Sequence, residues 1–437
     1  MKPIKRHPLY HTADQLKRGF ALHGFTLYDN GEEPELEEKE KSFDLFPVPD
    51  EYAASPVFLE DEAYAMRSSL LSALLPKMKT ALPIKGIAAG RIYDRRDPLF
   101  PTRMMIEGVY ADRDLTLKDL KELLTKIVKE IYGVGADVVL TAENRDVWKM
   151  EITTEEETFF FGLAAKANWL AKTLLDTDKP GVDTWILRIE VDALALHDAG
   201  FADRAALYSC DTKFPTSIES DAPAFGDTFA NKAADLLRRR GYLEFCGLKA
   251  YEPDCYKKMN MIQEAWDKNN DGIDLAEPLA EKYTWLPTVL TPSLEEALAA
   301  NYKAGKKEVR IFEIGHIFLP NPKGGAPMEK TALSFGCYGP DTDIRSFKAE
   351  VDAFLTELGI KNHFFIPTDL AIAYHPAECN LILDEKMNYL SGNFGGISPK
   401  AEANHGIGVH AFMAQLELKP LEEKVKEEYA FTPPELS

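Results

Sequence analysis

One short segment gathers arginines whose chemistry suits the binding of anions. Arg91, Arg95 and Arg96 lie close together, and Asp94 and Asp97 stand among them. A guanidinium can donate two parallel hydrogen bonds to a phosphate or a carboxylate, so this segment could hold an anionic substrate. The alternative is a surface cluster of ion pairs, which would contribute little to stability. The residues alone leave both interpretations open.

Other groupings that suggest a ligand are incomplete. Residues 267–272 resemble the start of a calcium-binding loop, but Pro278 stands where that loop needs a bidentate acid. His405 and His410 lack helical spacing and further ligands. The glycines of residues 392–396 do not form a phosphate-binding pattern between a strand and a helix, and they indicate a tight turn. The sequence therefore predicts no metal site.

Amphipathic helices are indicated by apolar residues that recur every three or four positions. Thr116 and Asp119 are spaced as a capping box at the start of one of them. Thr291 precedes Pro292 and is expected to cap another. The four helices predicted in this way span residues 116–132, 228–240, 292–303 and 347–358.

Strand-like runs occur in clusters and do not alternate strictly with the helices. This order favours an antiparallel sheet with helices on its faces, in the α+β class, over a doubly wound parallel sheet. The strands are expected at residues 86–93, 105–111, 136–141, 308–314, 331–338 and 412–418.

The bulk composition indicates a folded, water-soluble protein of two domains. The chain has 437 residues, of which 45% are hydrophobic and 28% charged. It contains no long apolar run, its start lacks the apolar core of a secretory signal, and its five cysteines show no CxxC spacing. We therefore expect reduced thiols, no membrane contact and a cytoplasmic location. Residues 215–226 are rich in Pro, Ser, Asp and Gly and are the expected linker between domains 1–214 and 227–437.

The formal net charge of −20 offers no general attraction for nucleic acid, although a local basic patch could still bind it. The only basic stretch free of nearby acids lies at residues 2–7. Arg238, Arg239 and Arg240 are expected on a solvated helix face.

The first half resembles the alpha subunit of phenylalanyl-tRNA synthetase, over about residues 7–214. The resemblance rests on short motifs that follow one another in the family's order. These are His7-Pro8, Gly24-Phe25, Gly90-Arg91-Ile92-Tyr93, Ile106-Glu107-Gly108, Leu120-Lys121, the run from Gly200 to Arg204, Ser209-Cys210-Asp211 and Phe214.

The second half resembles the catalytic-like module of the beta subunit of the same family. Its landmarks are Phe312-Glu313-Ile314-Gly315, Tyr374-His375-Pro376, Gly395-Gly396-Ile397-Ser398-Pro399 and Val409-His410-Ala411-Phe412. The resemblance implies a class II synthetase architecture, in which two antiparallel sheets flanked by helices pack as a pseudo-dimer within one chain. It also implies that the alpha-like module is degenerate.

The resemblance assigns candidate roles and shows where the family's site has changed. Arg91, Arg95 or Arg96 would serve as the motif 2 arginine, and Glu107 would hold a substrate ammonium, unless it is buried and paired instead. Arg103 and Arg188 are the remaining candidates for contact with ATP. However, Arg103-Met104-Met105 replaces the family's Phe-His-Gln triplet. In motif 3, Arg188, Glu190 and Ala193 stand where the family has Gly, Gly and Arg.

Two hypotheses follow from these changes. The first is a synthetase paralogue that has lost phenylalanine adenylation and binds an amino-acid-like ligand, a nucleotide, a tRNA end or a synthetase subunit. The second is an active ATP-dependent ligase, with ATP and magnesium as cofactors and an altered amino-acid or acceptor substrate. We expect a homodimer of chains, and we doubt independent recognition of a whole tRNA because the chain shows no anticodon-binding module.

Overall fold

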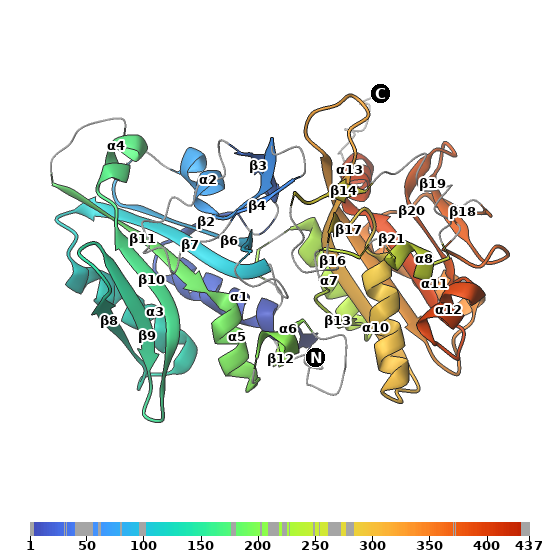
Figure 1. Cartoon of the computed structure of the whole chain (residues 1–437), viewed down its shortest axis with the longest axis horizontal. Helices are drawn as coiled ribbons and strands as arrows, with labels where there is room; N and C mark the ends of the chain where they lie inside the picture. The colour runs from blue at the N-terminus through green and yellow to red at the C-terminus, as the bar shows by residue number, and fades with distance from the viewer. Residues whose placement is uncertain are drawn as a thin grey trace, which may run out of the picture. The chain divides into compact units, whose positions relative to one another are not determined.

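The computed structural model divides the chain into two compact units. One unit comprises Pro8–Leu207 and Leu275–Ala280, and we call it the N-terminal unit; the other comprises Met1–His7, Tyr208–Asp274 and Glu281–Ser437, and we call it the C-terminal unit (Figure 1). The structure describes residues 4–29, 31, 33–39, 56–59, 63–78, 81–95, 102–175, 181–201, 203–208, 218–220, 225–226, 228–247, 250–252, 254–260, 272–276, 284–369, 371 and 373–429.

The N-terminal unit is built on a seven-stranded sheet with the order β2-β6-β7-β11-β10-β9-β8. All neighbouring pairs are antiparallel except β2 and β6, which run parallel. The strands are β2 (Thr26–Asp29), β6 (Ile84–Tyr93), β7 (Thr102–Arg113), β8 (Asp137–Ala142), β9 (Val147–Thr153), β10 (Thr158–Lys166) and β11 (Val182–Glu190). A small sheet of β3 (Leu36–Glu38), β4 (Val57–Phe58) and β5 (Tyr64–Met66) accompanies it.

Helices cover both faces of this sheet. On one face, α2 and α4 close an apolar cluster with strand residues that include Ala88, Val109 and Ile186. On the other, α1 packs against α5 and α3. The bounds are α1 (Pro8–Leu22), α2 (Leu71–Leu74), the 3-10 helix η2 (Leu75–Lys77), α3 (Leu117–Tyr132), α4 (Trp169–Leu175), α5 (Val191–Ala199) and α6 (Arg204–Leu207).

The C-terminal unit repeats this strand order as β13-β16-β17-β21-β20-β19-β18. Its edge strand β13 is again parallel to its neighbour, and the other neighbouring pairs are antiparallel. The strands are β13 (Leu243–Glu244), β16 (Val309–Leu319), β17 (Met328–Tyr338), β18 (His363–Pro367), β19 (Asn380–Asp384), β20 (Tyr389–Gly396) and β21 (Phe412–Glu417). Two short pairs lie beside it, β1 (Ile4–Arg6) with β12 (Ile218–Ser220) and β14 (Ile273–Asp274) with β15 (Trp285–Leu286).

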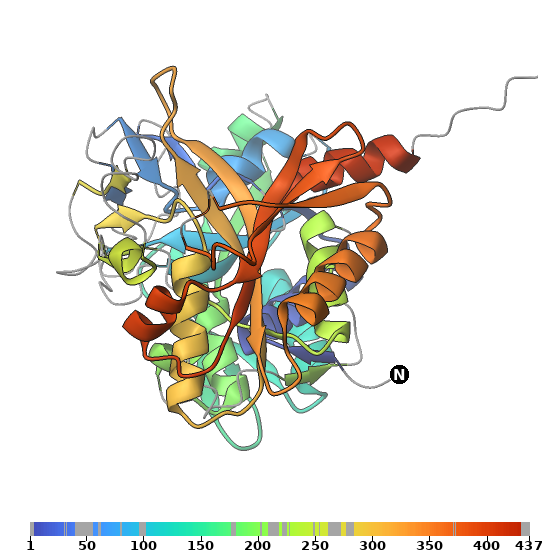
Figure 2. The same cartoon turned by 90° about the vertical axis from the view of Figure 1, so that its right-hand side faces the viewer.

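Figure 2 faces this unit and shows α10 and α11 on opposite sides of β17 and β21. Successive residues of a strand point to opposite faces, and Phe412 and Met413 accordingly enter two different apolar clusters. The helices are α7 (Phe229–Arg239), α8 (Cys255–Lys258), α10 (Thr291–Lys303), α11 (Ile344–Leu358), α12 (Pro399–His405) and α13 (Leu418–Tyr429). No helix in the part of the chain that the structure describes is long and apolar enough to cross a membrane.

The predicted α+β class is confirmed, as are the predicted helices and strands apart from their ends. Thr116 caps α3 in a complete capping box with Asp119. The expected cap at Thr291 is wrong, because α10 already begins at that residue and Leu290 precedes it. The packing of the two units as a pseudo-dimer stays a prediction.

The structure also tests what was expected of the linker and of the arginines of α7. Ile218–Ser220, within the expected linker, forms β12 and pairs with β1. The solvated face expected for the arginines of α7 is wrong for Arg238, which is buried and paired with Asp235 and Glu244 at 2.5 and 2.6 Å. The calcium-like run at residues 267–271 and Pro278 lies outside the described residues.

Candidate functional site

Strand register places four of the candidate charged residues on one face of the N-terminal sheet. Glu107 of β7 lies directly opposite Arg188 of β11, and Met105 lies opposite Glu190. Residues two apart on a strand share a face, so Arg103 joins Glu107, Arg188 and Glu190. This is the face that α2 and α4 cover, because Ala88 and Val109 of the same apolar cluster are in register with it. The sheet therefore gathers these residues although they lie far apart in the sequence.

Glu107 and Arg188 form a buried ion pair in which every carboxylate oxygen is used. Glu107 is 0% and Arg188 5% exposed, and Arg188 Nε donates to Glu107 Oε1 at 2.6 Å. Glu107 Oε2 accepts hydrogen bonds from Ser69 Oγ at 2.7 Å and from the backbone N–H of Leu70 at 2.6 Å and of Leu71 at 3.2 Å. The carboxylate thus ties the start of α2 to the sheet.

A second ion pair lies at the end of the same strands. Arg103 Nη1 donates to Glu190 Oε1 at 2.6 Å, and Arg103 Nε is 3.7 Å from the buried carboxylate of Asp94. Burial raises the pKa of Glu190 above its ordinary value, while the charge of Arg103 opposes that rise. Arg103 therefore meets two acids within the protein.

The remaining candidates are placed differently. Arg91 is opposite Met104 in the register and so points to the other face of the sheet. There its Nη2 donates to the hydroxyl of Tyr10, on α1, at 2.7 Å. Arg95 lies just after β6 and is partly buried, and Arg96 lies outside the described residues. Arg91 therefore lies on the face of the sheet opposite to Glu107 and Arg188.

The predicted motif 3 region is a strand followed by a helix, as β11 leads into α5. Glu190 occupies the N-cap position of α5, and Ala193 lies in its first turn. Sequence reasoning missed Asp192, which is 0% exposed and accepts a hydrogen bond from the backbone N–H of Met104 at 2.6 Å and from Arg204 Nε at 3.2 Å. An acid next to Glu190 at a helix start was the available signal, because acids favour the first turn of a helix.

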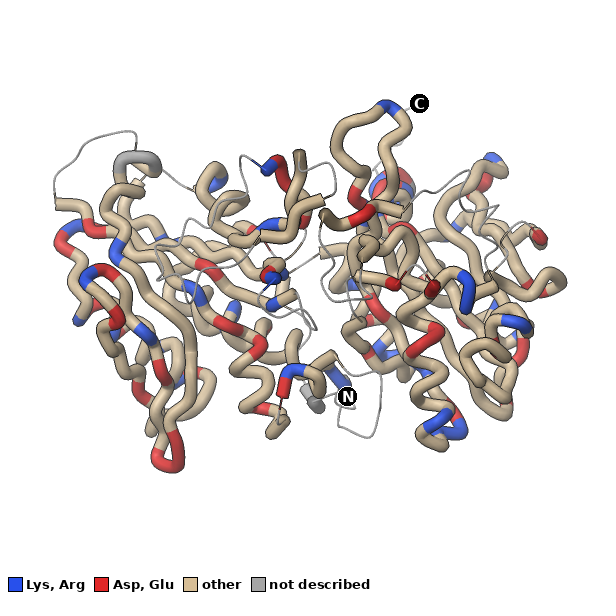
Figure 3. Tube along the Cα trace, in the orientation of Figure 1, with Lys and Arg blue, Asp and Glu red and all other residues tan. Residues whose placement is uncertain are grey.

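These contacts determine what the site can do. Figure 3 shows acids and bases interspersed along the chain, and the pairs described above put Arg188 beside Glu107 and Arg103 beside Glu190. Each of these guanidiniums already meets a carboxylate, whereas phosphate binding needs its hydrogen-bond donors and net positive charge. The positive charge of both arginines on this face is therefore offset by an acid of the protein itself.

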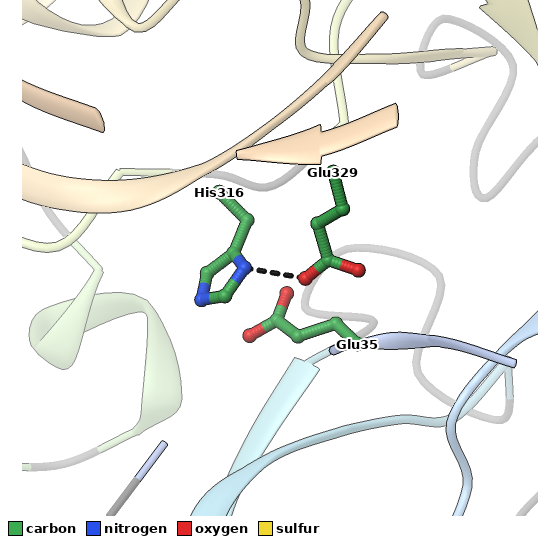
Figure 4. A group of neighbouring side chains, drawn as sticks. All are labelled: Glu35, His316 and Glu329. Atoms are coloured by element: carbon green, nitrogen blue, oxygen red, sulfur yellow. Dashed lines mark hydrogen bonds and ion pairs between the residues drawn. The ribbon is translucent and has the colours of Figure 1, made fainter. Parts of the chain in front are cut away.

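One further ionisable pair lies in the C-terminal unit. His316 Nδ1 and Glu329 Oε1 are 2.5 Å apart, across strands β16 and β17 (Figure 4). Both side chains are about nine-tenths buried. The two side chains therefore pair on neighbouring strands of one sheet.

Comparison with known proteins agrees with the two halves of the chain. Residues 1–144 match the class II core domain (F) of tRNA synthetases, and residues 212–418 match the CLM domain of the phenylalanyl-tRNA synthetase beta chain. The phenylalanine–tRNA ligase alpha subunit of Moorella thermoacetica is 32% identical over 141 residues, which is 29% of this chain and 39% of that protein.

Beta subunits match over longer stretches at lower identity. That of Clostridium acetobutylicum is 23% identical over 226 residues, covering 51% of this chain and 28% of the relative. That of Clostridium tetani is 24% identical over 282 residues, covering 59% and 35%. The chain thus spans well under half the length of each of these relatives. It belongs to the phenylalanyl-tRNA synthetase family, and it joins an alpha-subunit-like segment to a beta-subunit-like one.

Proposed function

We propose that this member of the family does not adenylate phenylalanine and acts by binding. The observation that supports the proposal is the internal pairing of Arg188 with Glu107 and of Arg103 with Glu190, each at 2.6 Å. A class II site needs arginines that are able to contact the phosphates and the carboxylate of the substrates. Here they already neutralise acids of the protein itself.

Energetics argue against a ligand that would displace these pairs. Removing one partner from a buried ion pair costs about 3 to 5 kcal/mol, because the other charge stays buried without compensation. A triphosphate that recruited Arg188 would leave Glu107 in that state, and one that recruited Arg103 would meet the carboxylate of Glu190. We expect ATP with magnesium to give no measurable heat at millimolar nucleotide.

An active ligase with an altered substrate is the second candidate. The observation that favours it is that β6 and β7 form an antiparallel pair and β11 leads directly into α5, with Arg103 and Arg188 on one face of the sheet. In that case Arg95 or Arg96 would be the motif 2 arginine, and Glu107 would hold the substrate ammonium. ATP and magnesium would be its cofactors.

Amino-acid-dependent pyrophosphate exchange, measured with each standard amino acid, separates the two candidates. A silent assay supports the binding function. A signal that Arg95→Ala with Arg96→Ala abolishes would establish the ligase and overturn our proposal.

Calorimetry of ATP binding gives a second test at the motif 3 turn. Glu190→Gly with Ala193→Arg removes one of the two acids that Arg103 meets and adds a guanidinium at the position where the family has one. We expect ATP binding to improve in this variant. Micromolar binding by the unaltered protein would contradict the proposal.

The ligand itself can be sought by thermal shift, since a ligand that binds the folded state raises its unfolding temperature. Amino acids, aminoacyl-adenylate mimics and tRNA acceptor-stem fragments are the probes that the family suggests. The last group tests whether a tRNA end is a partner of this chain.

A further inference from the structure

An exposed apolar patch lies at the outer edge of the C-terminal sheet. Phe364 and Ile366 of β18 are 51% and 36% exposed, and Tyr389 of β20 is 58% exposed. The register puts Phe364 and Tyr389 on either side of Leu383, and Ile366 beside Leu381. Cross-strand partners share a face of the sheet, so these five side chains lie on one face, with the buried Leu383 between the exposed Phe364 and Tyr389. We call it the β18 patch.

The matching surface of the N-terminal sheet is polar. There β8 occupies the position of β18, and its Thr141 and Val139 lie opposite Lys149 and Glu151 of β9. Lys149 and Glu151 form an ion pair at 2.6 Å. The same strand order thus permits a polar outer face, so the apolar β18 patch is not required by the fold. Contiguous exposed apolar residues usually mark an interaction surface.

The strand β18 is complementary to a second copy of itself. It contains no Lys, Arg, Asp or Glu, the charges that commonly protect sheet edges from pairing. In an antiparallel alignment about a twofold axis at Phe365, Phe364 faces Ile366 of the partner subunit. The same axis puts Lys361 opposite Asp369 of the partner subunit. Both of these residues are exposed, so the alignment matches apolar with apolar residues and base with acid.

Backbone directions fit this alignment. The N–H of Thr368 donates to the carbonyl of Cys379 inside the sheet, so alternate residues His363, Phe365 and Pro367 turn their backbone groups outward. Phe365 can exchange two hydrogen bonds with the partner's Phe365, and His363 can donate to the carbonyl of the partner's Pro367. Pro367 has no N–H to donate, and it therefore ends the ladder.

We infer that two copies of this chain associate through β18, with the strands antiparallel and Phe365 on the twofold axis. Twofold dimers are the commonest soluble oligomers, and their interfaces must be self-complementary in this way. The patch is small, so the interface belongs to the low end of the size range, near about 1,200 Å² in total.

Light scattering of the full chain tests the inference. The measured mass is expected to rise from the 49.0 kDa of one chain towards twice that value between about 1 and 100 μM, the range expected for a small interface. Ile366→Lys should keep the protein monomeric throughout. Val139→Lys, which puts the same charge on the equivalent strand of the N-terminal sheet, is the matched control and should leave the dimer unchanged. Unaltered unfolding temperatures would show that both variants are folded.

A charge exchange tests the register. Lys361→Asp and Asp369→Lys should each weaken the dimer by at least about threefold, because each sets like charges opposite one another at two symmetric places. The double variant restores opposite charges and should recover the affinity. A protein that stays monomeric, or a dimer that Ile366→Lys leaves intact, overturns the proposed surface. Single variants without effect, or a double variant without recovery, overturn the antiparallel register.

Discussion

The two sheets share one strand order, yet each places a buried carboxylate on a different strand. In the N-terminal sheet, the residues in register across the neighbouring strands β6, β7 and β11 are Ala88, Glu107 and Arg188. In the C-terminal sheet, the corresponding residues are Glu313, Ser334 and Gln415. The acid thus lies on β7 in one unit and on β16, the counterpart of β6, in the other.

The carboxylates of Glu107 and Glu313 nevertheless make similar hydrogen bonds. Glu107 accepts from Ser69 before α2, and Glu313 accepts from Ser293 in the first turn of α10 at 2.8 Å and from the N–H of Gly247 at 2.9 Å. In both units a glutamate therefore holds a helix start against the sheet. What the N-terminal unit adds at this position is Arg188, whose guanidinium pairs with Glu107, whereas the neutral Gln415 stands at the corresponding position of the C-terminal sheet.

The largest difference in stability between the two units should appear when Arg188 and its counterpart Gln415 are each replaced. Arg188→Met leaves Glu107 buried without its counterion and should lower the free energy of unfolding by about 3 to 5 kcal/mol. Gln415→Met removes a neutral acceptor of the Leu290 N–H and should cost only about 1 to 3 kcal/mol. Urea-induced unfolding measures both. Equal losses would show that the charge of Arg188 adds nothing to the N-terminal sheet.

The serine contacts should behave alike in the two units. Ser69→Ala and Ser293→Ala each remove a hydrogen bond to a buried carboxylate, for an expected loss of about 1.5 to 3 kcal/mol. Ser72→Ala is the control, because its half-buried hydroxyl meets Glu37 at 3.1 Å and should matter less. If only one of the two serine variants lost stability, Glu107 and Glu313 would not have equivalent structural roles.

The smallest expected changes in stability come from two histidines, one in each unit. Each of them lies between two carboxylates. Hydrogen bonding to Glu402, and then to Glu378, raises the pKa of His410 to about 9. The pKa of His197 is also raised by Asp198 and Glu157, against the effect of burial. The protonated His410 should therefore stabilise the fold fully below pH 6.5, and this contribution should be lost as the pH rises through about 9.

We expect a change below about 1 kcal/mol for His410, because its side chain is one-third exposed and solvent screens the pair. His410→Gln should remove this part of the pH dependence, and NMR titration of the ring should give the pKa directly. A ring that titrates near 6.5 would show that the two glutamates do not hold it in solution.

Much of the local structure was predictable, whereas the pairing within the site was not. The capping box of Thr116 and Asp119 was evident because its partners are three residues apart. Glu107, in contrast, meets residues that are 38 and 81 positions away, and only the strand register brings them together. Arg91 was grouped by sequence with the other candidate arginines, but alternation along β6 places it on the face of the sheet opposite to Glu107 and Arg188. The resemblance to the family indicated candidate residues, and the strand register determines which of them are in contact.

Two glycines inside strands limit how this protein can change. The tight turn expected at residues 392–396 is wrong, because these residues belong to β20. A Cβ on Gly162 of β10 would lie 2.2 Å from the carbonyl oxygen of Arg188, and one on Gly392 of β20 would lie 1.8 Å from that of Gln415. Gly392 also has a φ of +61°, which side chains disfavour. Both positions are thus closed to any other residue while the strands stay paired, whatever the neighbouring side chains bind. Mutational scanning should find both positions intolerant of replacement, which would give the two sheets a common landmark independent of any activity.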